Sequence, residues 1–457
     1  MIKDNRILIQ DIIRHDYHEI KPGSDIKLGP AMDIISVCGR IKSLRKMGKC
    51  IFLHIEENFR KIQVFISKNI VEESKFIAAK SWKVGDHIEA EGSLFKTEAG
   101  EITIKAKDIK LLQEFKQFMP DLHNGITDPE TKYRHRHLDL LVNEDSVSIF
   151  RKRISMIAEI RQFLAYEKFL EVETPILHGI VGGASAKPFK TVLNYLNEEV
   201  NLRIAPELYL KRLMVGGFSR VFEIGKSFRN EGISHKHNPE FTSMEMYMAY
   251  SDYHDMMELT NNLLLRIVDK KILRDIRKIT LNESLLMHNS DMNIHHLNDE
   301  EFLNQKLNSL GVKRKMTKGE MLFELFEQTV EDNLIDPTFI IDYPLDVSPL
   351  AKTKEDDPEL VERFEFFVNG MELANGFSEL TDPIEQSKRL KQQIEKKNAG
   401  NDEAMEYDQE FLDALEYGLP PCSGCGIGID RLVMYATNCH SIKDVILFPF
   451  LRRLTNK

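Results

Sequence analysis

The sequence predicts an α+β protein in which a small N-terminal β-barrel precedes a larger domain built on an antiparallel sheet flanked by helices. Two patterns support this prediction. Five β-rich runs fall within residues 33–112, and a helical piece at 70–82 lies between the third and fourth runs. Beyond residue 136, strands and helices mix without a regular βαβ alternation, which favours an antiparallel sheet.

The order of the N-terminal elements is informative in itself. Five short strands with one helix after the third is the order of an oligonucleotide-binding (OB) fold. The five runs are DIISVCGRIKSL, CIFLHIEE, RKIQVFIS, DHIEAEGSLF and EITIKAKDIKLL. A five-stranded barrel that binds no nucleic acid would show the same pattern, so both interpretations stay open.

The composition changes sharply after the barrel. Residues 113–136 are polar and contain two prolines and a glycine, which is typical of a linker. We therefore expect an N-terminal domain over 1–112, a linker over 113–136 and a second domain over 137–457. The second domain should begin with an amphipathic helix over 145–169 and a strand over 171–177.

Composition limits the class of protein. The 457 residues are 42% hydrophobic and 29% charged, as in ordinary globular proteins, and the net charge of −10 requires any nucleic-acid contact to be a local patch. We expect no signal peptide and no membrane span, because no apolar stretch reaches about 20 residues.

Five cysteines, an odd and small number, indicate reduced thiols in the cytoplasm. Cys422 and Cys425 have the spacing of zinc ligands, but no second CxxC pair exists, which favours a chain without structural metal.

Three separated stretches carry candidate chemistry: FLEVETPIL (169–177), FRNEGISHKHNPEFT (228–242) and GCGIGIDRLVMYA (424–436). The second lies between two strand-like runs, and neither a helical nor a strand period organises its apolar positions. It contains Arg229, and the third contains Arg431. In this order and spacing the three stretches resemble the signature motifs of class II aminoacyl-tRNA synthetases.

Longer segments narrow the resemblance. Four segments are similar to bacterial-type lysyl-tRNA synthetases: RIAPELYLKRLMVGGF, FRNEGISHKHNPEFTSMEMYMAYSDY, RFEFFVNGMELANGFSEL and DVILFPFLRR. The similarity covers essentially the whole chain. The resemblance implies an OB-fold anticodon-binding domain and a class II catalytic domain. It also implies a homodimer that consumes ATP with Mg²⁺ and joins L-lysine to the 3′ end of tRNA(Lys).

The resemblance also assigns a nucleotide site. Arg229 and Arg431 are the expected catalytic residues, with Arg229 bridging the lysine carboxylate and the α-phosphate. Glu365 and Glu372 flank a turn and would converge on Mg²⁺ if their segments form a hairpin; two surface glutamates are the alternative. As alternatives to nucleotide binding, Arg229 could form an ion pair within the protein and Phe241 could belong to the core. The implied ATP-binding residues are Arg229, Glu231, His237, Asn238, Phe241, Glu365, Glu372 and Arg431.

The implied lysine site is rich in carboxylates, which suits a substrate with two ammonium groups. An aspartate site would need cations, and asparagine has no charged head group to pair. Glu207, with Gly183, is assigned to the α-ammonium, and Glu379 with Tyr247 to the ε-ammonium. The implied residues are Gly183, Glu207, Arg229, Glu245, Tyr247, Asn375, Phe377 and Glu379.

In the barrel, the resemblance assigns anticodon recognition to Arg45, Phe52, Gln63 and Glu101. Single-stranded RNA is read by stacking bases on aromatic or guanidinium planes and by hydrogen bonds to their edges. The segment IKSLRKMGK adds a local basic hairpin. Phe52 could instead belong to the core, because Ile51 and Leu53 beside it are apolar.

Some features depart from the family pattern. Lys187 stands where the family usually has arginine, Cys425 replaces an aliphatic residue, and residues 270–320 look shortened and diverged, which leaves the loops there uncertain.

Three rival functions remain. An aspartate- or asparagine-specific relative is disfavoured by the carboxylates, and a ligase that attaches lysine to a protein is disfavoured by the barrel. A non-catalytic RNA-binding relative is disfavoured because the catalytic arginines and both glutamates of the hairpin are present.

Overall fold

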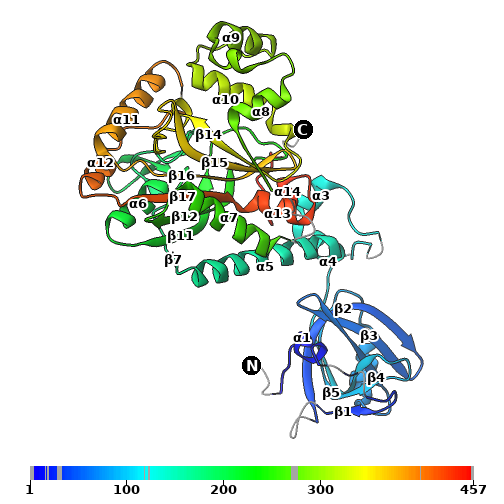
Figure 1. Ribbon diagram of the computed structural model, residues 1–457. Helices are drawn as coiled ribbons and strands as arrows, with labels where there is room; N and C mark the ends of the chain where they lie inside the picture. The colour runs from blue at the N-terminus through cyan, green and yellow to red at the C-terminus, as the bar shows by residue number, and fades with distance from the viewer. Residues whose placement is uncertain are drawn as a thin grey trace. The chain divides into compact units, whose positions relative to one another are not determined.

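The computed structural model describes residues 5–15, 17, 20–27, 33–117, 119–121, 124–268, 276–401 and 403–453. The chain divides into two compact units, shown in Figure 1. The first, the barrel unit, comprises Met1–Thr127 with Leu141–Asn143, and the second, the catalytic unit, comprises Asp128–Leu140 with Glu144–Lys457. Within the described residues, no helix is both long and apolar enough to cross a membrane.

The barrel unit has the predicted five strands and one helix. The strands are β2 (Ile35–Met47), β3 (Cys50–Glu57), β4 (Arg60–Ser67), β5 (His87–Lys96) and β6 (Ile102–Gln113), and α2 (Glu73–Ala79) lies between β4 and β5. The strand order is β1-β5-β2-β3-β4-β6, and a further pairing of β5 with β6 closes the barrel. The two-residue strand β1 (Asp25–Ile26) and the short helix α1 (Ile9–Ile13) were not predicted.

Alternation along β3 separates the inside of the barrel from its surface. Ile51, Leu53 and Ile55 are at most 1% exposed and belong to the barrel core. Phe52 lies between them on the opposite face of the strand and is only half-buried. The interpretation of Phe52 as a core residue is therefore wrong.

The catalytic unit is built on one eight-stranded sheet of order β13-β14-β15-β16-β17-β12-β11-β7. Its strands are β7 (Leu170–Glu171), β11 (Arg220–Phe228), β12 (Glu240–Ala249), β13 (Arg277–Thr280), β14 (Thr338–Pro344), β15 (Leu360–Val368), β16 (Met371–Ser378) and β17 (Cys422–Gly428). All neighbouring pairs are antiparallel except β13–β14 and β7–β11. The prediction of an α+β fold with an antiparallel sheet is confirmed.

One face of the sheet carries the main core. It packs against α5 (Glu144–Tyr166), α7 (Tyr253–Ile267), α13 (Ile429–Thr437) and α14 (Ile442–Val445). Met244 and Met246 of β12 and Cys425 and Ile427 of β17 point into this core. Because side chains alternate along a strand, the residues between them face the other side.

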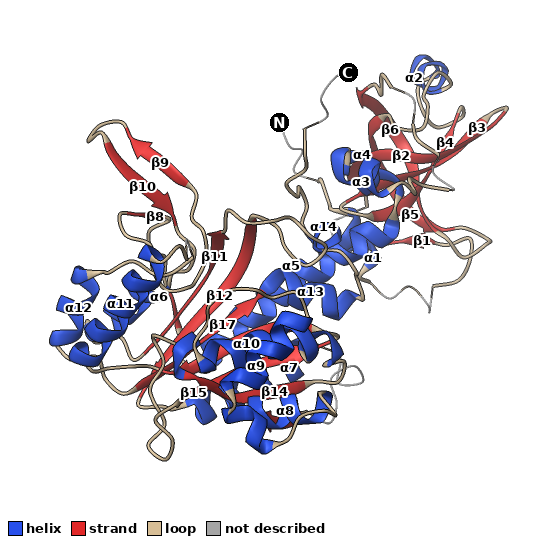
Figure 2. Ribbon diagram, turned by 90° about the horizontal axis from the view of Figure 1, so that it is seen from above, coloured by secondary structure: helices blue, strands red, loops and turns tan. Residues whose placement is uncertain are grey.

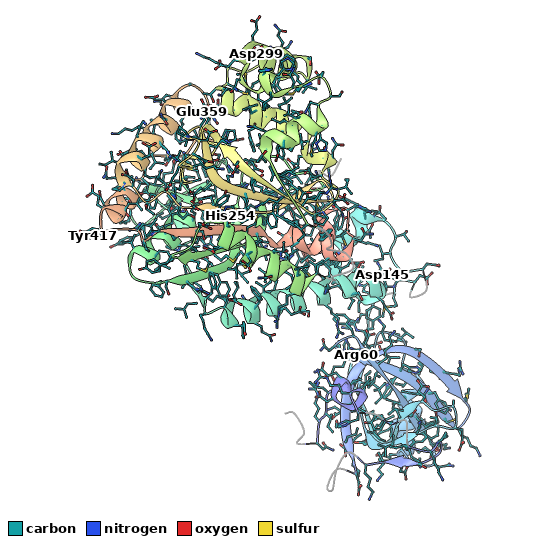
Figure 3. All side chains as sticks on the ribbon, viewed as in Figure 1. Arg60, Asp145, His254, Asp299, Glu359 and Tyr417 are labelled. Carbon is teal, nitrogen blue, oxygen red and sulfur yellow. The ribbon has the colours of Figure 1, made fainter. Side chains whose placement is uncertain are left out.

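The other face is covered only at its two ends. Near β11 and β12 lie α6 (Glu207–Val215), α11 (Pro383–Asn398) and α12 (Gln409–Glu416), and near β14 lie α8 (Leu281–His288), α9 (Glu300–Ser309) and α10 (Lys318–Thr329). Figure 3 shows the two groups at separate ends of the unit, with Tyr417 at the end of α12 and Asp299 at the start of α9. Three short 3₁₀ segments complete this side: η1 (Ile294–Asn298), η2 (Glu331–Asn333) and η3 (Leu345–Val347).

A second, three-stranded sheet extends from the unit, as Figure 2 shows. It contains β8 (Leu177–His178), β9 (Lys190–Leu193) and β10 (Glu198–Leu202), in the order β8-β10-β9. The single strand predicted over 171–177 is therefore wrong, because only the two-residue strands β7 and β8 form at its ends. Pro175 has no N–H for a strand ladder, and the backbone N–H and hydroxyl of Thr174 donate instead to the Glu223 carboxylate, at 3.1 and 2.7 Å.

Two further segments differ from the expectation. The segment predicted as a linker contains α3 (Pro129–Arg134), followed by α4 (Arg136–Val142). Asp128 caps α3 by accepting a hydrogen bond from the Thr131 N–H at 2.8 Å, with proline at the first helical position. In the diverged region, the structure forms β13, α8 and α9, while residues 270–275 lie outside the described part. The predicted domain boundaries themselves stay a prediction.

Candidate active site

The open face of the large sheet has a floor of glycines. Gly424, Gly426 and Gly428 of β17 point to the face opposite the core residues Cys425 and Ile427. Strands β12 and β16 flank β17 on its two sides. A β-carbon added at Gly426 would have neighbours at 3.7 and 3.9 Å, whereas at Gly424 it would overlap Tyr247 and Glu379, so the room on this strand lies above Gly426.

The strand register brings four predicted lysine-binding residues to this floor. Gly426 is paired with Glu245 on β12 and with Asn375 on β16, and Gly424 is paired in the same way with Tyr247 and Phe377. Paired residues of neighbouring strands point to the same face. Segments about 130 residues apart in the sequence therefore supply side chains to one site.

Glu207 and Glu379 are joined by a lysine that the sequence analysis missed. The Lys211 ammonium lies 2.6 Å from Glu207 Oε1 and 2.5 Å from Glu379 Oε2, and its side chain is 0% exposed. Burial alone would lower the pKa of Lys211, but the two carboxylates outweigh it and raise that pKa, so the ammonium stays charged. The Glu207–Lys211 spacing of four residues on a helix was a signal that could have found this contact.

Gly183 is needed for close packing against this helix. Its φ is +86°, which side chains rarely adopt, and a β-carbon added there would lie 2.9 Å from Glu207 Cβ. Gly183 thus lets the loop touch the first turn of α6.

Glu245 and Tyr247 form a hydrogen-bonded pair on β12. The Tyr247 hydroxyl donates to Glu245 Oε2 at 3.2 Å. Burial, together with the negative charge of Glu207, raises the pKa of Glu245 to about 8. Glu245 is therefore mainly protonated at neutral pH, which lowers the negative charge of the free pocket.

Arg229 lies over an aromatic ring on the neighbouring strand. Its guanidinium carbon is 5.2 Å from the centroid of the Phe241 ring, a cation–π geometry. Its buried Nε has no hydrogen-bond partner within the described residues. Phe241 belongs to β12, which begins at Glu240. The strand-like run SMEMYMAY seen in the sequence begins three residues later, at Ser243. Arg229 therefore occupies one face of this ring.

His237 and Arg431 are in direct contact. An Arg431 N–H donates to His237 Nε2 at 3.0 Å, and the Nδ1 atom of the same ring lies 2.9 Å from Ser234 Oγ. Burial and the cations Arg431 and Arg229 lower the pKa of His237. The imidazole is therefore neutral, accepting from Arg431 and donating to Ser234.

Two predicted nucleotide-binding residues have local partners instead. Asn238 is buried and donates to the Glu240 carbonyl at 2.6 Å, while its side-chain oxygen has no partner within the described residues. Glu231 is exposed and accepts from the Lys187 backbone N–H at 3.4 Å. Among the described contacts, neither residue touches Arg229 or Arg431.

Glu365 and Glu372 stand on the predicted hairpin, formed by β15 and β16. Glu365 is 5% exposed, accepts from the Tyr343 hydroxyl at 2.9 Å and pairs with Arg363. Burial raises the pKa of Glu365 to about 7, against the effect of Arg363 and with added repulsion from Glu372. Glu365 is therefore not a surface glutamate.

Arg363 connects this pair of carboxylates to the lysine pocket. It is 9% exposed, and its Nε donates to Asn375 Oδ1 at 3.2 Å. On the other side, Arg431 donates to the Glu372 carboxylate at 3.3 Å. The sequence analysis assigned no role to Arg363, although its two-residue spacing from Glu365 on a strand places both on one face.

The cysteines of the CxxC spacing do not form a chelating pair. Cys422 packs with α6, α11 and α12, whereas Cys425 points into the core on the opposite face of β17. Within the described part of the chain, no group of three or more His, Cys, Asp or Glu residues could hold a metal ion.

Comparison with known families agrees with this geometry. Residues 128–452 match the family of class II tRNA synthetases for D, K and N, and residues 35–112 match the OB-fold nucleic acid binding domain. Lysine–tRNA ligases from Aromatoleum aromaticum and Pectobacterium carotovorum are 47% and 46% identical, each over 92% of this chain and 86% of the relative. One from Legionella pneumophila is 46% identical over 92% of this chain and 88% of the relative. The chain belongs to the lysine–tRNA ligase family of class II synthetases.

The residues predicted to bind the anticodon lie on the outer face of the barrel, and their role stays a prediction. Phe52 and Phe65 lie on the outer face with ring centroids 4.8 Å apart, and Phe95 follows at 6.3 Å from Phe65. Glu101 accepts from Gln63 Nε2 at 2.6 Å. Arg45 is exposed and paired with Phe52 across β2 and β3.

The sequence analysis missed part of this outer face. Phe65 and Phe95 extend the aromatic row, and the His54 ring lies 2.6 Å from Glu101. The signal was the strand alternation itself, because each of these residues occupies an outward position between buried aliphatic residues.

Proposed function

We propose that this lysine–tRNA ligase condenses lysine with ATP to lysyl-adenylate, releasing pyrophosphate, and then transfers the lysyl group to the 3′-terminal ribose of tRNA(Lys). The observation that carries the proposal is the ring of carboxylates around the glycine floor. A pocket that contains Glu207, Glu245 and Glu379 suits a substrate with two ammonium groups and would repel the carboxylate of aspartate.

The lysine substrate would lie along the sheet face above Gly426, where a β-carbon would meet nothing closer than 3.7 Å. Glu207 would hold the α-ammonium and Glu379 the ε-ammonium. Glu379 is 1% exposed, and its Oε1 has no hydrogen-bond partner within the described residues, whereas its Oε2 lies 2.5 Å from the Lys211 ammonium. A buried carboxylate with unused acceptor capacity supports its assignment to a substrate ammonium. Phe377 would pack against the aliphatic stem.

ATP would lie toward Arg229 and Arg431. The buried Nε of Arg229 is unpartnered, which supports a role in binding the lysine carboxylate and the α-phosphate, with Asn375 nearby. His237 would face the terminal phosphates, Phe241 would stack on adenine, and Asn238 and Glu231 would complete the site. Catalysis would consist of positioning and electrostatic stabilisation of an in-line displacement.

Glu365 and Glu372 would hold Mg²⁺. They lie on facing strands, and the negative charge of Glu372 contributes to the raised pKa of Glu365, as expected for two carboxylates that share a site. Mg²⁺ is typically bound by one or two carboxylates together with phosphate oxygens. The metal would neutralise charge on the ATP phosphates.

We also propose a homodimer. The segment from α5 to β8 exposes Ile154 (66%), Tyr166 (76%), Leu170 (55%) and Leu177 (50%). Large apolar side chains gathered on one segment favour a protein interface, and the two-fold dimer is the commonest soluble oligomer. Light scattering at micromolar concentration should give about twice 53 kDa, and a fully active monomer would contradict this proposal. The cytoplasmic location remains a prediction.

Charging of tRNA tests the proposed function as a whole. The purified protein should attach labelled lysine to tRNA(Lys) in the presence of ATP and Mg²⁺, and it should leave tRNA(Asp) and tRNA(Asn) uncharged. Charging of either of those tRNAs with its own amino acid would show that the pocket has been misassigned.

A further inference from the structure

Lys211 has no role in the proposed reaction, although it lies at the pocket and is completely buried. Its ammonium spans Glu207 on α6 and Glu379 just beyond β16, at 2.6 and 2.5 Å. The rings of Phe377 and Phe411 lie 5.4 and 5.9 Å from Nζ. A buried cation is tolerated only when it is paired, so at least one of the two carboxylates must stay ionised beside it.

The two carboxylates that Lys211 joins are those assigned to opposite ends of the substrate. The α-ammonium would bind Glu207 and the ε-ammonium would bind Glu379. A single internal ammonium therefore fixes the distance between the two ends of the site. The contact with Glu379 is a short ion pair rather than an aligned hydrogen bond, which leaves acceptor capacity for the substrate.

We propose that Lys211 is a positioning and specificity-determining residue, which holds Glu207 and Glu379 ionised and at a fixed separation so that the site selects lysine over shorter diamino acids. This inference rests on the proposed function, because it requires those two residues to bind the substrate ammonium groups. It explains how Glu207 and Glu379 remain together in one pocket before a cationic substrate arrives.

Electrostatics supports this role. Burial raises the pKa of Glu379, Lys211 opposes that rise, and Glu207 and Glu245 add to it. Without the Lys211 cation, mutual repulsion would make one carboxylate take up a proton at neutral pH. A protonated Glu379 would then bind an ammonium poorly. The other titratable or charged groups whose field reaches this network are Tyr247 on β12, Arg363 on β15 and Cys422 on β17.

The test is lysine-dependent ATP–pyrophosphate exchange by the full-length protein between pH 6 and 9, with lysine and with ornithine, which is one methylene shorter. Lys211→Met should raise KM for lysine at pH 7 by about tenfold or more, equivalent to a shift of one pKa unit. The KM should recover as the pH rises, because Glu379 then ionises. KM for ATP should change less than about threefold.

The matched control is Arg136→Met. Arg136 is another buried cation of the catalytic unit with a carboxylate partner, Asp139, at 2.6 Å. Among the described residues, it contacts α3, α4, α5 and the segment 443–447 rather than the pocket. This variant should lose stability but keep the parent dependence of KM on pH. If KM for lysine depends on pH in the same way in both variants, Lys211 has only a structural role and the inference is overturned.

Lys211→Arg decides the question if Lys211→Met does not fold. It keeps the charge but bridges the carboxylates with a longer, planar group. Because the longer bridge should move Glu207 and Glu379 farther apart, the ratio of kcat/KM for ornithine to that for lysine should fall about tenfold or more, within the range of about 10–200-fold that one methylene provides. An unchanged ratio would overturn the inference. A parent protein that shows no exchange with lysine would instead contradict the proposed function.

Discussion

Gly426 is paired with Glu245 across β17 and β12, and a β-carbon built on Gly426 would lie 3.7 Å from Glu245 Cγ, an ordinary van der Waals distance. The position has room for a methyl group in the free protein. Glycine is therefore not required there by the fold, which points to the space above it as the place of the substrate.

Gly426→Ala should fold normally and bind substrate poorly. The added methyl would project from the floor into the volume that lysine occupies, and a group of this size changes specificity by about 1–3 kcal/mol. We expect kcat/KM for lysine in pyrophosphate exchange to fall about 10- to 200-fold while the melting temperature stays near that of the parent. Gly179→Ala, at another open position, is the control and should behave like the parent. Full activity of Gly426→Ala would place the substrate elsewhere.

Glu379→Gln should impair lysine binding selectively. Removing one partner of a buried charged pair costs about 2–5 kcal/mol, so kcat/KM for lysine should fall by about two orders of magnitude or more, with little change in KM for ATP. Initial rates of pyrophosphate exchange at varied lysine and ATP measure both quantities. Glu385→Gln, on α11, is the matched control. If Glu379→Gln activates lysine as well as the parent does, another carboxylate holds the head group.

Glu245 should make the stability of the free enzyme depend on pH. Its folded pKa of about 8 lies above the usual value of about 4.3, so folding takes up a proton. The associated stability is present below the unfolded pKa and is lost as the pH rises through about 8. Thermal melting without substrates should therefore show falling stability from about pH 5 to 8, and Glu245→Gln should flatten that fall. An identical slope in the variant would refute the assignment.

Phe52→Ala should separate the two functions of the chain. One stacked base is worth about 1–3 kcal/mol, so tRNA(Lys) charging should weaken about 5- to 150-fold. Pyrophosphate exchange without tRNA should stay near the parent level, because the lysine and ATP residues lie in the other unit. Phe59→Ala, an exposed aromatic on the β3–β4 turn, should charge tRNA normally. Normal charging by Phe52→Ala would remove Phe52 from the anticodon site.

Much of the fold followed from local patterns. The five barrel strands are predictable because each alternates or is bounded by turn residues, and the long helix over 145–166 because its apolar positions repeat with the helical period. The structure of residues 171–177 after this helix was not predictable. Composition favours a strand there, but Pro175 cannot donate to a strand ladder and Thr174 donates to Glu223 instead. That contact joins residues 49 positions apart, which no local pattern reveals.

The site was predictable in its residues but not in its connections. The family resemblance assigns Glu207, Glu245 and Glu379 to the lysine site. It does not predict the cation between Glu207 and Glu379, because in the sequence Lys211 looks like an ordinary polar residue of a helix. Arg363 was missed for the same reason. The geometry of buried ion pairs depends on strand register and helix docking, which tertiary packing decides.

The central claim is that the carboxylate-rich pocket activates lysine. ATP–pyrophosphate exchange with each of the twenty amino acids, in the presence of Mg²⁺ and without tRNA, tests it most directly. We expect exchange with lysine to be at least about thirtyfold above that with any other amino acid, because removal of a charged partner costs about 2–5 kcal/mol and 2 kcal/mol corresponds to about thirtyfold. Exchange driven by aspartate or asparagine, or no exchange with lysine, would contradict it.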